Sequence, residues 1–237
     1  MNLATFDTYK IALEIYSSTC RTGFNAPGFC ILNFGNRIDS ITFRQLMVDI
    51  KTQLAKIHER ETNKTLIYLS AGRFDQQEST KPHLDGGPQE SLLMLGYEPT
   101  QIDSTVEIID FSKCAFEFEL TPNEFMAKYN PMFKSNISIL EPYSTYIESF
   151  SKEDYQIVCI NNSSSPYSYN KSWQGVLHNA TIKNPNESIR RIINSTMIAP
   201  ALLKEIDVIS QADIKDFIHT SKVKRRGYDK LHLQDDK

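Results

Sequence analysis

Cysteine is scarce in this chain, and its few occurrences match neither a zinc site nor a disulfide framework. The four residues are scattered as Cys20, Cys30, Cys114 and Cys159, and no Cys-x-x-Cys pair occurs. Zinc clusters and small disulfide scaffolds both depend on close, regular spacings. Cys159 lies in an apolar, strand-like run and is expected to be a small core residue. We therefore expect a reducing, cytoplasmic location.

The sequence also lacks a membrane-spanning run, a secretory signal and an excess of basic residues. Each of these absences excludes one class of protein. No apolar run approaches the roughly 20 residues that a membrane-spanning helix needs. Residues Met1–Asp7 show no basic region followed by an apolar core, so no secretory signal is expected. A net charge of -3 lacks the basic excess of proteins that bind nucleic acid. We expect neither a membrane nor a nucleic acid as a partner.

The remaining composition is ordinary for a globular protein, with 40% hydrophobic and 23% charged residues. A length of 237 residues suffices for one large β domain or two small ones. Because no repeat or low-complexity linker interrupts the chain, we expect a single domain over residues 1–237. Its parts are an N-terminal helix and strand addition (1–64), a β core (65–200) and a C-terminal helical extension (201–237).

The core region is built from short strand-like runs separated by turn signals. This pattern of short strands and turns predicts an all-β sandwich or barrel rather than alternating β and α units. Ser163–Pro166 is interpreted as an exposed loop between two of the runs. The runs are Thr65–Leu69, Ser91–Tyr97, Thr105–Asp110, Ala115–Leu120, Tyr155–Ile160, Gln174–Ile182 and Ile189–Ile198.

Helices are expected at both ends of the chain and once within the core. Residues 9–18 fit a short helix or, failing that, a strand, and residues 28–34 fit a strand. Thr42 is expected to cap a helix that runs to Glu61. The string Thr121-Pro122-Asn123-Glu124 has a capping threonine, a proline at the first helical position and an acid at the third. After Ala201, helix-forming residues are followed by a basic cluster at 222–226, which is interpreted as a solvated face or a frayed end.

The tripeptide His83-Leu84-Asp85 is the first candidate for chemistry. In an extended chain, residues two apart point to the same face, so His83 and Asp85 could hold one metal ion between them. Imidazole and carboxylate suit a borderline divalent ion. The tripeptide also occurs by chance in polar loops, so the hypothesis needs a second histidine and a basic partner.

His178 and an arginine pair supply these further residues. His178 lies within the strand-like run Gln174–Ile182, and Arg190 and Arg191 follow 12 and 13 residues later in another apolar run. Arginine is seldom buried without a partner. An arginine that faces the interior must therefore meet an anion, and its planar guanidinium matches a carboxylate with two parallel hydrogen bonds.

The order and spacing of these motifs resemble the Fe(II)/2-oxoglutarate-dependent oxygenase family. The resemblance covers roughly Thr65 to Ile198, and Arg190-Arg191-Ile192-Ile193 is similar to the corresponding strand of the taurine dioxygenase group. Members of the family have a double-stranded β-helix, a jelly-roll or cupin-like barrel. The resemblance therefore implies a mainly β fold with flanking helices.

The resemblance also implies roles for individual residues. His83, Asp85 and His178 would be the iron ligands, and Arg191 would bind the distal carboxylate of 2-oxoglutarate, the cosubstrate. Only one arginine of the pair should point inward, so Arg190 would face out unless the register is off by one. Tyr97 is a further candidate donor to the same carboxylate, or else a core or rim aromatic. Where taurine dioxygenase-type enzymes carry an arginine for a sulfonate, this chain has Ser195, which argues against a sulfonate substrate.

The implied activity is hydroxylation of a small molecule with dioxygen, releasing succinate and CO2. Two alternatives stay open at this point: a cupin-like metal enzyme that does not use 2-oxoglutarate, and a barrel that serves as a non-catalytic binding module. The polar segment Arg73–Thr80 is a candidate lining of the substrate entrance, together with Gly86–Pro88. A plain connecting loop is the other interpretation of this segment.

Overall fold

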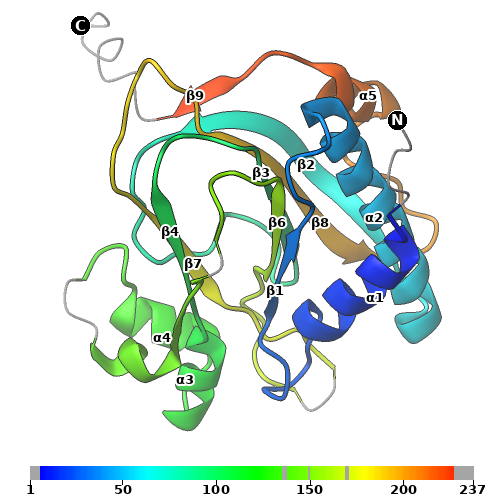
Figure 1. The fold of residues 1–237 in the computed structure, drawn as a ribbon. Helices are drawn as coiled ribbons and strands as arrows, with labels where there is room; N and C mark the ends of the chain where they lie inside the picture. The colour runs from blue at the N-terminus through cyan, green and yellow to red at the C-terminus, as the bar shows by residue number, and fades with distance from the viewer. Residues whose placement is uncertain (1–5, 135–137, 149, 169–170, 227–237) are drawn as a thin grey trace, which may run out of the picture.

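The computed structural model describes residues 6–134, 138–148, 150–168 and 171–226. These residues form two β-sheets with helices packed outside them (Figure 1). The elements in order are α1 (Thr8–Thr19), β1 (Phe29–Asn33), α2 (Ser40–Thr62), β2 (Thr65–Gln76), β3 (Leu92–Tyr97), β4 (Ser104–Ile109), α3 (Phe111–Glu117), α4 (Pro122–Tyr129), the 3-10 helix η1 (Ser138–Tyr143), β5 (Ser144–Tyr146), β6 (Gln156–Asn161), β7 (Leu177–Ile182), β8 (Ile192–Ala201), α5 (Gln211–His219) and β9 (Lys224–Arg226).

The larger sheet has six strands in the order β1-β6-β3-β8-β2-β9, and the smaller sheet has three in the order β5-β4-β7. Neighbouring strands are antiparallel except β2 and β9, which are parallel. The N-terminal segment thus supplies one edge strand of the larger sheet and the C-terminal extension supplies the other. Within the described residues the two sheets share no hydrogen-bonded strand pair and do not close into a barrel. Helical residues are about as numerous as strand residues, so the fold is mixed rather than mainly β.

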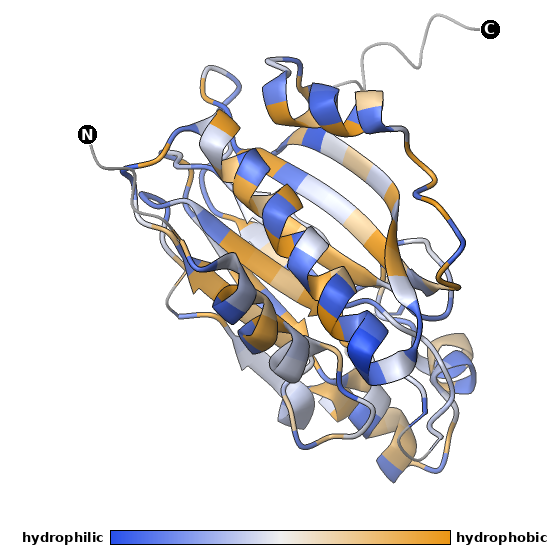
Figure 2. Ribbon diagram, turned by 90° about the vertical axis from the view of Figure 1, so that its right-hand side faces the viewer, coloured by the Kyte–Doolittle hydropathy of each residue, from blue (hydrophilic) through white to orange (hydrophobic). Residues whose placement is uncertain are grey.

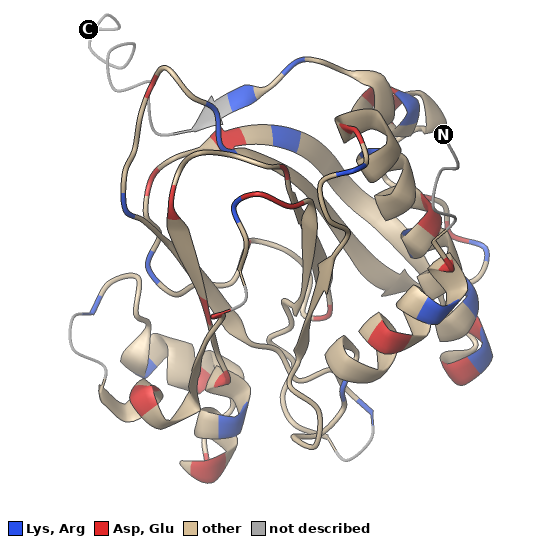
Figure 3. Ribbon diagram, viewed as in Figure 1, with Lys and Arg blue, Asp and Glu red and all other residues tan. Residues whose placement is uncertain are grey.

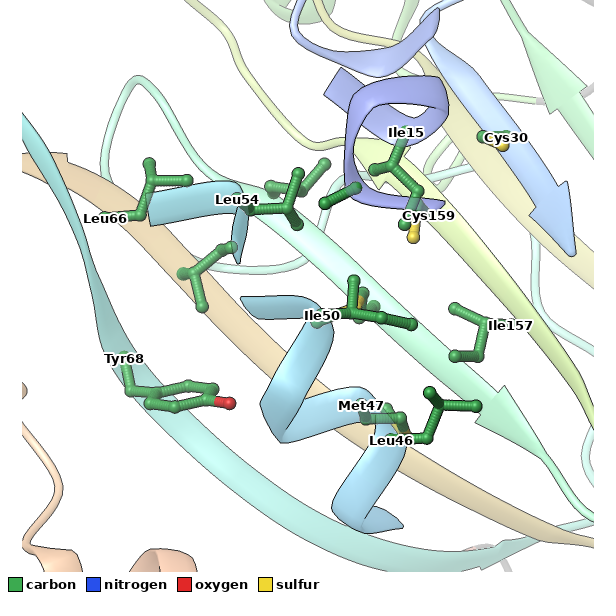
Figure 4. Packing of buried hydrophobic residues seen from close by; sticks show 14 of the residues in the cluster. Ile15, Cys30, Leu46, Met47, Ile50, Leu54, Leu66, Tyr68, Ile157 and Cys159 are labelled. Carbon is green, nitrogen blue, oxygen red and sulfur yellow. The ribbon is translucent and has the colours of Figure 1, made fainter. Parts of the chain in front are cut away.

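Helices α1, α2 and α5 cover one face of the larger sheet, and α2 runs across it (Figure 2). The core on this side joins Ile50 and Leu54 of α2 to Leu66 of β2 and Cys159 of β6 (Figure 4). Asp39 begins α2, since its carboxylate accepts a hydrogen bond from the Thr42 N–H at 2.7 Å. The predicted cap at Thr42 is therefore wrong by three residues, because Asp39, Ser40 and Thr42 are all residues that commonly cap helices and they stand within four positions of each other.

The other face of the larger sheet packs toward the smaller sheet. Strand β3 borders both layers, which explains its unbroken apolar run. Leu92 and Met94 belong to the core under the helices, whereas Leu93 and Leu95 belong to the core between the sheets. This alternation follows from the two-residue period of a strand, and both sets of side chains are buried.

Helices α3 and α4 close one end of the sandwich around a third cluster that contains Phe111 and Phe125. The capping box predicted at Thr121 and Glu124 is confirmed. The strand predicted at Ala115–Leu120 is wrong, because this stretch is the end of α3 and its C-terminal turn. Phe111, Cys114 and Ala115 have helical spacing and are buried, and Asp110 caps their helix.

Two loop predictions also need correction. Ser163 and Ser165 are buried rather than exposed, because their loop packs against the segment before β3. Gly175 approaches this loop so closely that an added Cβ would lie 2.0 Å from the Ser163 carbonyl oxygen, so only glycine fits there. Residues 202–206 form a turn and coil with exposed apolar side chains instead of a helix, whereas the helix around Phe217 is confirmed as α5.

The four cysteines, all within the described part of the chain, are free thiols, and Cys159 is a fully buried core residue as predicted. Among the helices that the structure describes, none combines the length and apolar character needed to cross a membrane.

Candidate metal centre

His83 and His178 lie side by side although 95 positions of chain separate them. His178 is on β7, and His83 follows β2 in the segment that leads to β3. The two residues exchange both backbone hydrogen bonds, His83 N–H to the His178 carbonyl and the reverse, each at 3.1 Å. This isolated bridge holds their rings at a centroid distance of 4.4 Å.

Asp85 completes the cluster. One potential ligand atom from each of His83, Asp85 and His178 lies within 4.8 Å of the other two. Within the cluster, His83 Nε2 lies 3.4 Å from an Asp85 carboxylate oxygen. The structure therefore brings together the three residues that the motif analysis selected as metal ligands.

The backbone of Asp85 is fixed by Asn162, which follows β6. The Asn162 side-chain oxygen accepts from the Asp85 N–H at 2.8 Å, and its amide nitrogen donates to the Asp85 carbonyl at 2.9 Å. Asn162 is 2% exposed and also bonds Ser91 Oγ. Nothing in the sequence singles out this residue, because its contact with Asp85 depends on how β6 is placed in the sheet.

The two histidines differ in protonation, and His178 is held in the neutral form that a metal ligand requires. Burial lowers the pKa of His178 to about 4, and the neighbouring His83 acts in the same direction. His83 is also penalised by burial, but hydrogen bonds to Asp85 and to the Lys81 carbonyl outweigh this and raise its pKa. The bond from Nδ1 to Lys81, at 2.7 Å, leaves Nε2 of a neutral His83 with a lone pair beside Asp85.

Two imidazoles and one carboxylate on one side of a site fit a divalent ion such as Fe(II). The Nδ1 atom of His178 is buried without a hydrogen-bond partner in the described part of the chain. A neutral His178 has a lone pair on one ring nitrogen, and a cation would accept it. The donor chemistry and the spacing of the three ligand atoms therefore agree with a mononuclear metal centre.

A cavity of about 410 Å³ opens beside the cluster, between the two sheets. The larger sheet lines it with side chains of β2, β3 and β8, and the smaller sheet lines it with residues of β7. His83, Asp85 and His178 all face this space, as do Tyr97 and Arg191. The volume falls within the usual range for small-molecule sites.

Arg191 is the buried cation of this cavity, with 1% of its surface exposed. Its Nε donates to Ser104 Oγ and its Nη1 donates to the Gln76 carbonyl, both at 3.1 Å. Its Nη2 is buried and has no hydrogen-bond partner among the described residues. An unpaired charged donor in this position is costly, so a ligand with an acceptor is the natural complement.

Tyr97 packs against this guanidinium, and Arg190 points elsewhere. The Arg191 Cζ atom lies 5.1 Å from the centre of the Tyr97 ring. Burial raises the pKa of Tyr97, and the nearby Arg191 opposes the rise. Arg190 is exposed and does not line the cavity, so the alternation argument selects Arg191. Both arginines precede β8, which begins at Ile192 rather than at Ile189.

The predicted entrance segment lines the cavity only in part. Phe74, Gln76, Glu78 and Thr80 contribute to the wall, as does Gly86. Arg73 does not, because it lies on the opposite face of β2 and its side chain pairs with Glu98 at 2.9 Å. Residues 73–76 are also part of strand β2 rather than a loop.

Comparison with known proteins gives no match: no protein-family profile covers the chain, and no curated protein is similar to it. The motifs and the geometry described above therefore carry the functional conclusion by themselves.

Proposed function

We propose that this chain is an Fe(II)- and 2-oxoglutarate-dependent oxygenase that hydroxylates a small molecule. The observation that carries this proposal is the buried, partly unpaired guanidinium of Arg191 in the same cavity as the three clustered ligand atoms. A dicarboxylate that bridges the two features would supply the acceptor for Nη2 and a chelating end for the metal. One oxygen atom of dioxygen would enter the substrate, and the other would enter succinate as CO2 leaves.

His83, Asp85 and His178 would hold the iron on one face and leave three positions open. When bound, the iron supplies the dioxygen activation that couples decarboxylation of the cosubstrate to oxidation of a C–H bond. The chain's own residues would bind and orient the cosubstrate. Arg191 would fix the distal carboxylate by charge and by its planar geometry, and this positioning lowers the barrier by holding the reactants in register.

The architecture is compatible with this function. Two sheets that face each other across a cavity, one of them carrying His178 on β7, support the proposal that the fold is an open form of the double-stranded β-helix. The apolar residues Leu93, Leu95 and Ile193 line the same cavity and would keep its wall dry around the reacting groups.

The first test is succinate formation from 2-oxoglutarate in the presence of Fe(II) and dioxygen, without a prime substrate. Slow uncoupled turnover is expected in the wild type and none in His178→Ala. His219→Ala is the matched control, because His219 is exposed on α5, away from the cavity. Equal turnover in wild type and His178→Ala would assign the succinate to free iron and contradict the proposal.

The second test separates this function from that of a metal enzyme without 2-oxoglutarate. Anaerobic titration of the Fe(II)-loaded protein with 2-oxoglutarate is expected to develop the weak visible charge-transfer band of the chelate. Arg191→Gln should weaken 2-oxoglutarate binding at least tenfold, as expected for loss of a charge-assisted hydrogen bond. Arg190→Gln, one residue away and exposed, should leave it unchanged. Metal binding without any 2-oxoglutarate binding would favour the cupin-like alternative.

A further inference from the structure

Two side chains of opposite charge line the cavity without an ion-pair partner in the part of the chain that the structure describes. They are the carboxylate of Glu78 and the ammonium group of Lys224. Both residues are exposed, so they lie at the opening of the cavity, whereas Arg191 and His178 are buried inside it. The opening therefore offers one group that can bind a cation and one that can bind an anion.

The Glu78 backbone is held in place from both sides. The preceding Gln77 is 4% exposed, and its amide nitrogen donates to the Ile189 carbonyl at 2.6 Å. The following Ser79 accepts a hydrogen bond from the Ile182 N–H at 2.9 Å. Glu78 is thus carried by a segment tied to β7 and to the turn before β8, so the backbone position from which its side chain extends is fixed.

Lys224 is also carried by regular structure. It lies on β9, the edge strand of the larger sheet beside β2, and β9 is drawn blue where the strand begins (Figure 3). Its register partner on β2 is Phe74, which lines the cavity. Paired residues on neighbouring strands point to the same face of a sheet, so the pairing directs Lys224 to the cavity side.

Part of the cavity wall is apolar. Phe74, Leu95, Ile193 and Met197 contribute to it. The cavity therefore combines opposite charges at its opening with apolar wall residues and with the clustered ligand atoms of His83, Asp85 and His178. Arg191 does not add to the charges available for the substrate, since the proposed function assigns it to 2-oxoglutarate.

We infer that the prime substrate is a small zwitterion of the α-amino acid type. Glu78 binds its ammonium group, Lys224 binds its carboxylate, and its aliphatic side chain extends toward His83, Asp85 and His178. Hydroxylation then falls on the side chain rather than on the α-carbon. A simple anion would leave Glu78 unpaired beside another negative charge. A simple cation would leave Lys224 unpaired beside another positive charge. This substrate assignment rests on the oxygenase function proposed above.

The first experiment measures succinate formation by the Fe(II)-loaded protein with each of the twenty common L-amino acids. At least one amino acid is expected to accelerate turnover, and its N-acetyl and carboxamide derivatives are expected to lose the effect. Equal stimulation by either derivative, or no stimulation by any amino acid, overturns the assignment. Uncoupled turnover that persists in such a case leaves the oxygenase function standing, so the two failures are distinguishable.

The second experiment uses charge-neutral variants with the stimulating amino acid. Lys224→Gln and Glu78→Gln should each raise its KM about tenfold or more, the usual effect of losing a hydrogen bond to a charged group, and leave the KM for 2-oxoglutarate unchanged. Lys222→Gln and Glu187→Gln are matched controls, since both residues are exposed and lie outside the cavity. An effect of Lys224→Gln alone would indicate a simple anion, and an effect of Glu78→Gln alone a simple cation. Either result overturns the zwitterion.

Discussion

The guanidinium carbon of Arg191 lies 5.1 Å from the centre of the Tyr97 ring, inside the cavity that holds the metal-ligand cluster. A cation over an aromatic face is attracted by the ring, more strongly where water is excluded. Both residues are buried, Tyr97 with 6% and Arg191 with 1% of their surface exposed. Tyr97 therefore supports the arginine from one side, while Nη2 has no hydrogen-bond partner among the described residues.

Replacing Tyr97 tests the two parts of its side chain separately. Tyr97→Phe keeps the ring over Arg191, so the free energy of unfolding should hardly change. If the hydroxyl donates to the cosubstrate carboxylate, the Kd for 2-oxoglutarate rises about three- to tenfold, the effect of one hydrogen bond. Tyr97→Leu removes the ring as well and should weaken binding further. Anaerobic calorimetry with Fe(II) measures these constants, and a Kd for Tyr97→Phe equal to that of the wild type would assign Tyr97 a packing role only.

Asn162 is expected to control metal affinity without touching the metal. Asn162→Ala removes both hydrogen bonds that fix the backbone of Asp85, so the carboxylate loses its preset position. Loss of such an outer contact costs about 10- to 100-fold in metal affinity. Competition with a chromogenic chelator measures the Kd for Fe(II) or Co(II).

Asn161→Ala provides the matched control for this variant. Asn161 is equally buried, but its side chain bonds the Thr19 carbonyl and the Ser163 N–H rather than the metal-ligand loop. It should lower thermal stability and leave the metal Kd near that of the wild type. A similar loss of metal affinity in both variants would reveal a general folding defect.

Local signals could be predicted from the sequence, and long-range pairings could not. The capping box at Thr121 and Glu124 is complete within four residues, and the buried strand around Met94 shows in one apolar run. The contact of Asn162 with Asp85 spans 77 positions and has no local mark. Lys224 reaches the cavity only because β9 joins the edge of β2. From the sequence, the basic cluster of the C-terminal segment therefore predicts only a solvated face or a frayed end.

The candidate metal ligands show the same difference between local signals and long-range pairings. His83 and Asp85 could be paired because they are two positions apart, whereas His178 was selected through the arginine that follows it. The strand predicted at Ala115–Leu120 failed because Phe116 and Phe118 suggest an alternating pattern, although both are exposed at the end of a helix. A short apolar run does not distinguish a strand from a helix by its period alone.

His58 is expected to make the protein acid-sensitive. It is 2% exposed, its Nδ1 shares a hydrogen bond with Tyr16, and burial lowers its pKa to about 4. The neutral form is favoured in the folded state, while an unfolded histidine titrates near 6.5. The resulting stability is therefore complete above pH 6.5, declines as the pH falls from 6.5 to about 4, and amounts to about 3 kcal/mol at most.

His58→Phe isolates this contribution from that of the carboxylates and of His178. Chemical denaturation from pH 7 to pH 4 should show a smaller loss of unfolding free energy in the variant than in the wild type. The variant keeps a ring against Trp173, whose ring centre lies 5.4 Å from that of His58. Parallel stability curves for the two proteins would show that His58 does not titrate in this range.

Glu119→Gly is expected to stabilise the protein. Glu119 follows α3 with a φ of 54°, a left-handed conformation that costs a residue with a side chain about 1 kcal/mol and glycine nothing. Its N–H bonds the Phe116 carbonyl and the Leu120 N–H bonds the Ala115 carbonyl, the arrangement in which helices usually carry glycine. Thermal denaturation should show a higher Tm for Glu119→Gly, and Glu119→Ala should show no such gain.

Strand β3 borders the helix-covered core on one side and the cavity on the other. The β3 side of the cavity and its β9 edge therefore differ in how freely their residues can be substituted. Leu93 and Leu95 form the floor of the cavity, and their strand neighbours Leu92 and Met94 are locked under α2. A new shape in the floor would have to be matched by repacking across the whole sheet. Lys224 sits on a three-residue edge strand with a single neighbouring strand. Under the proposed function, selectivity for new substrates should therefore be gained at this edge, where the chain can vary its chemistry while the interior that holds His83, Asp85 and His178 stays as it is.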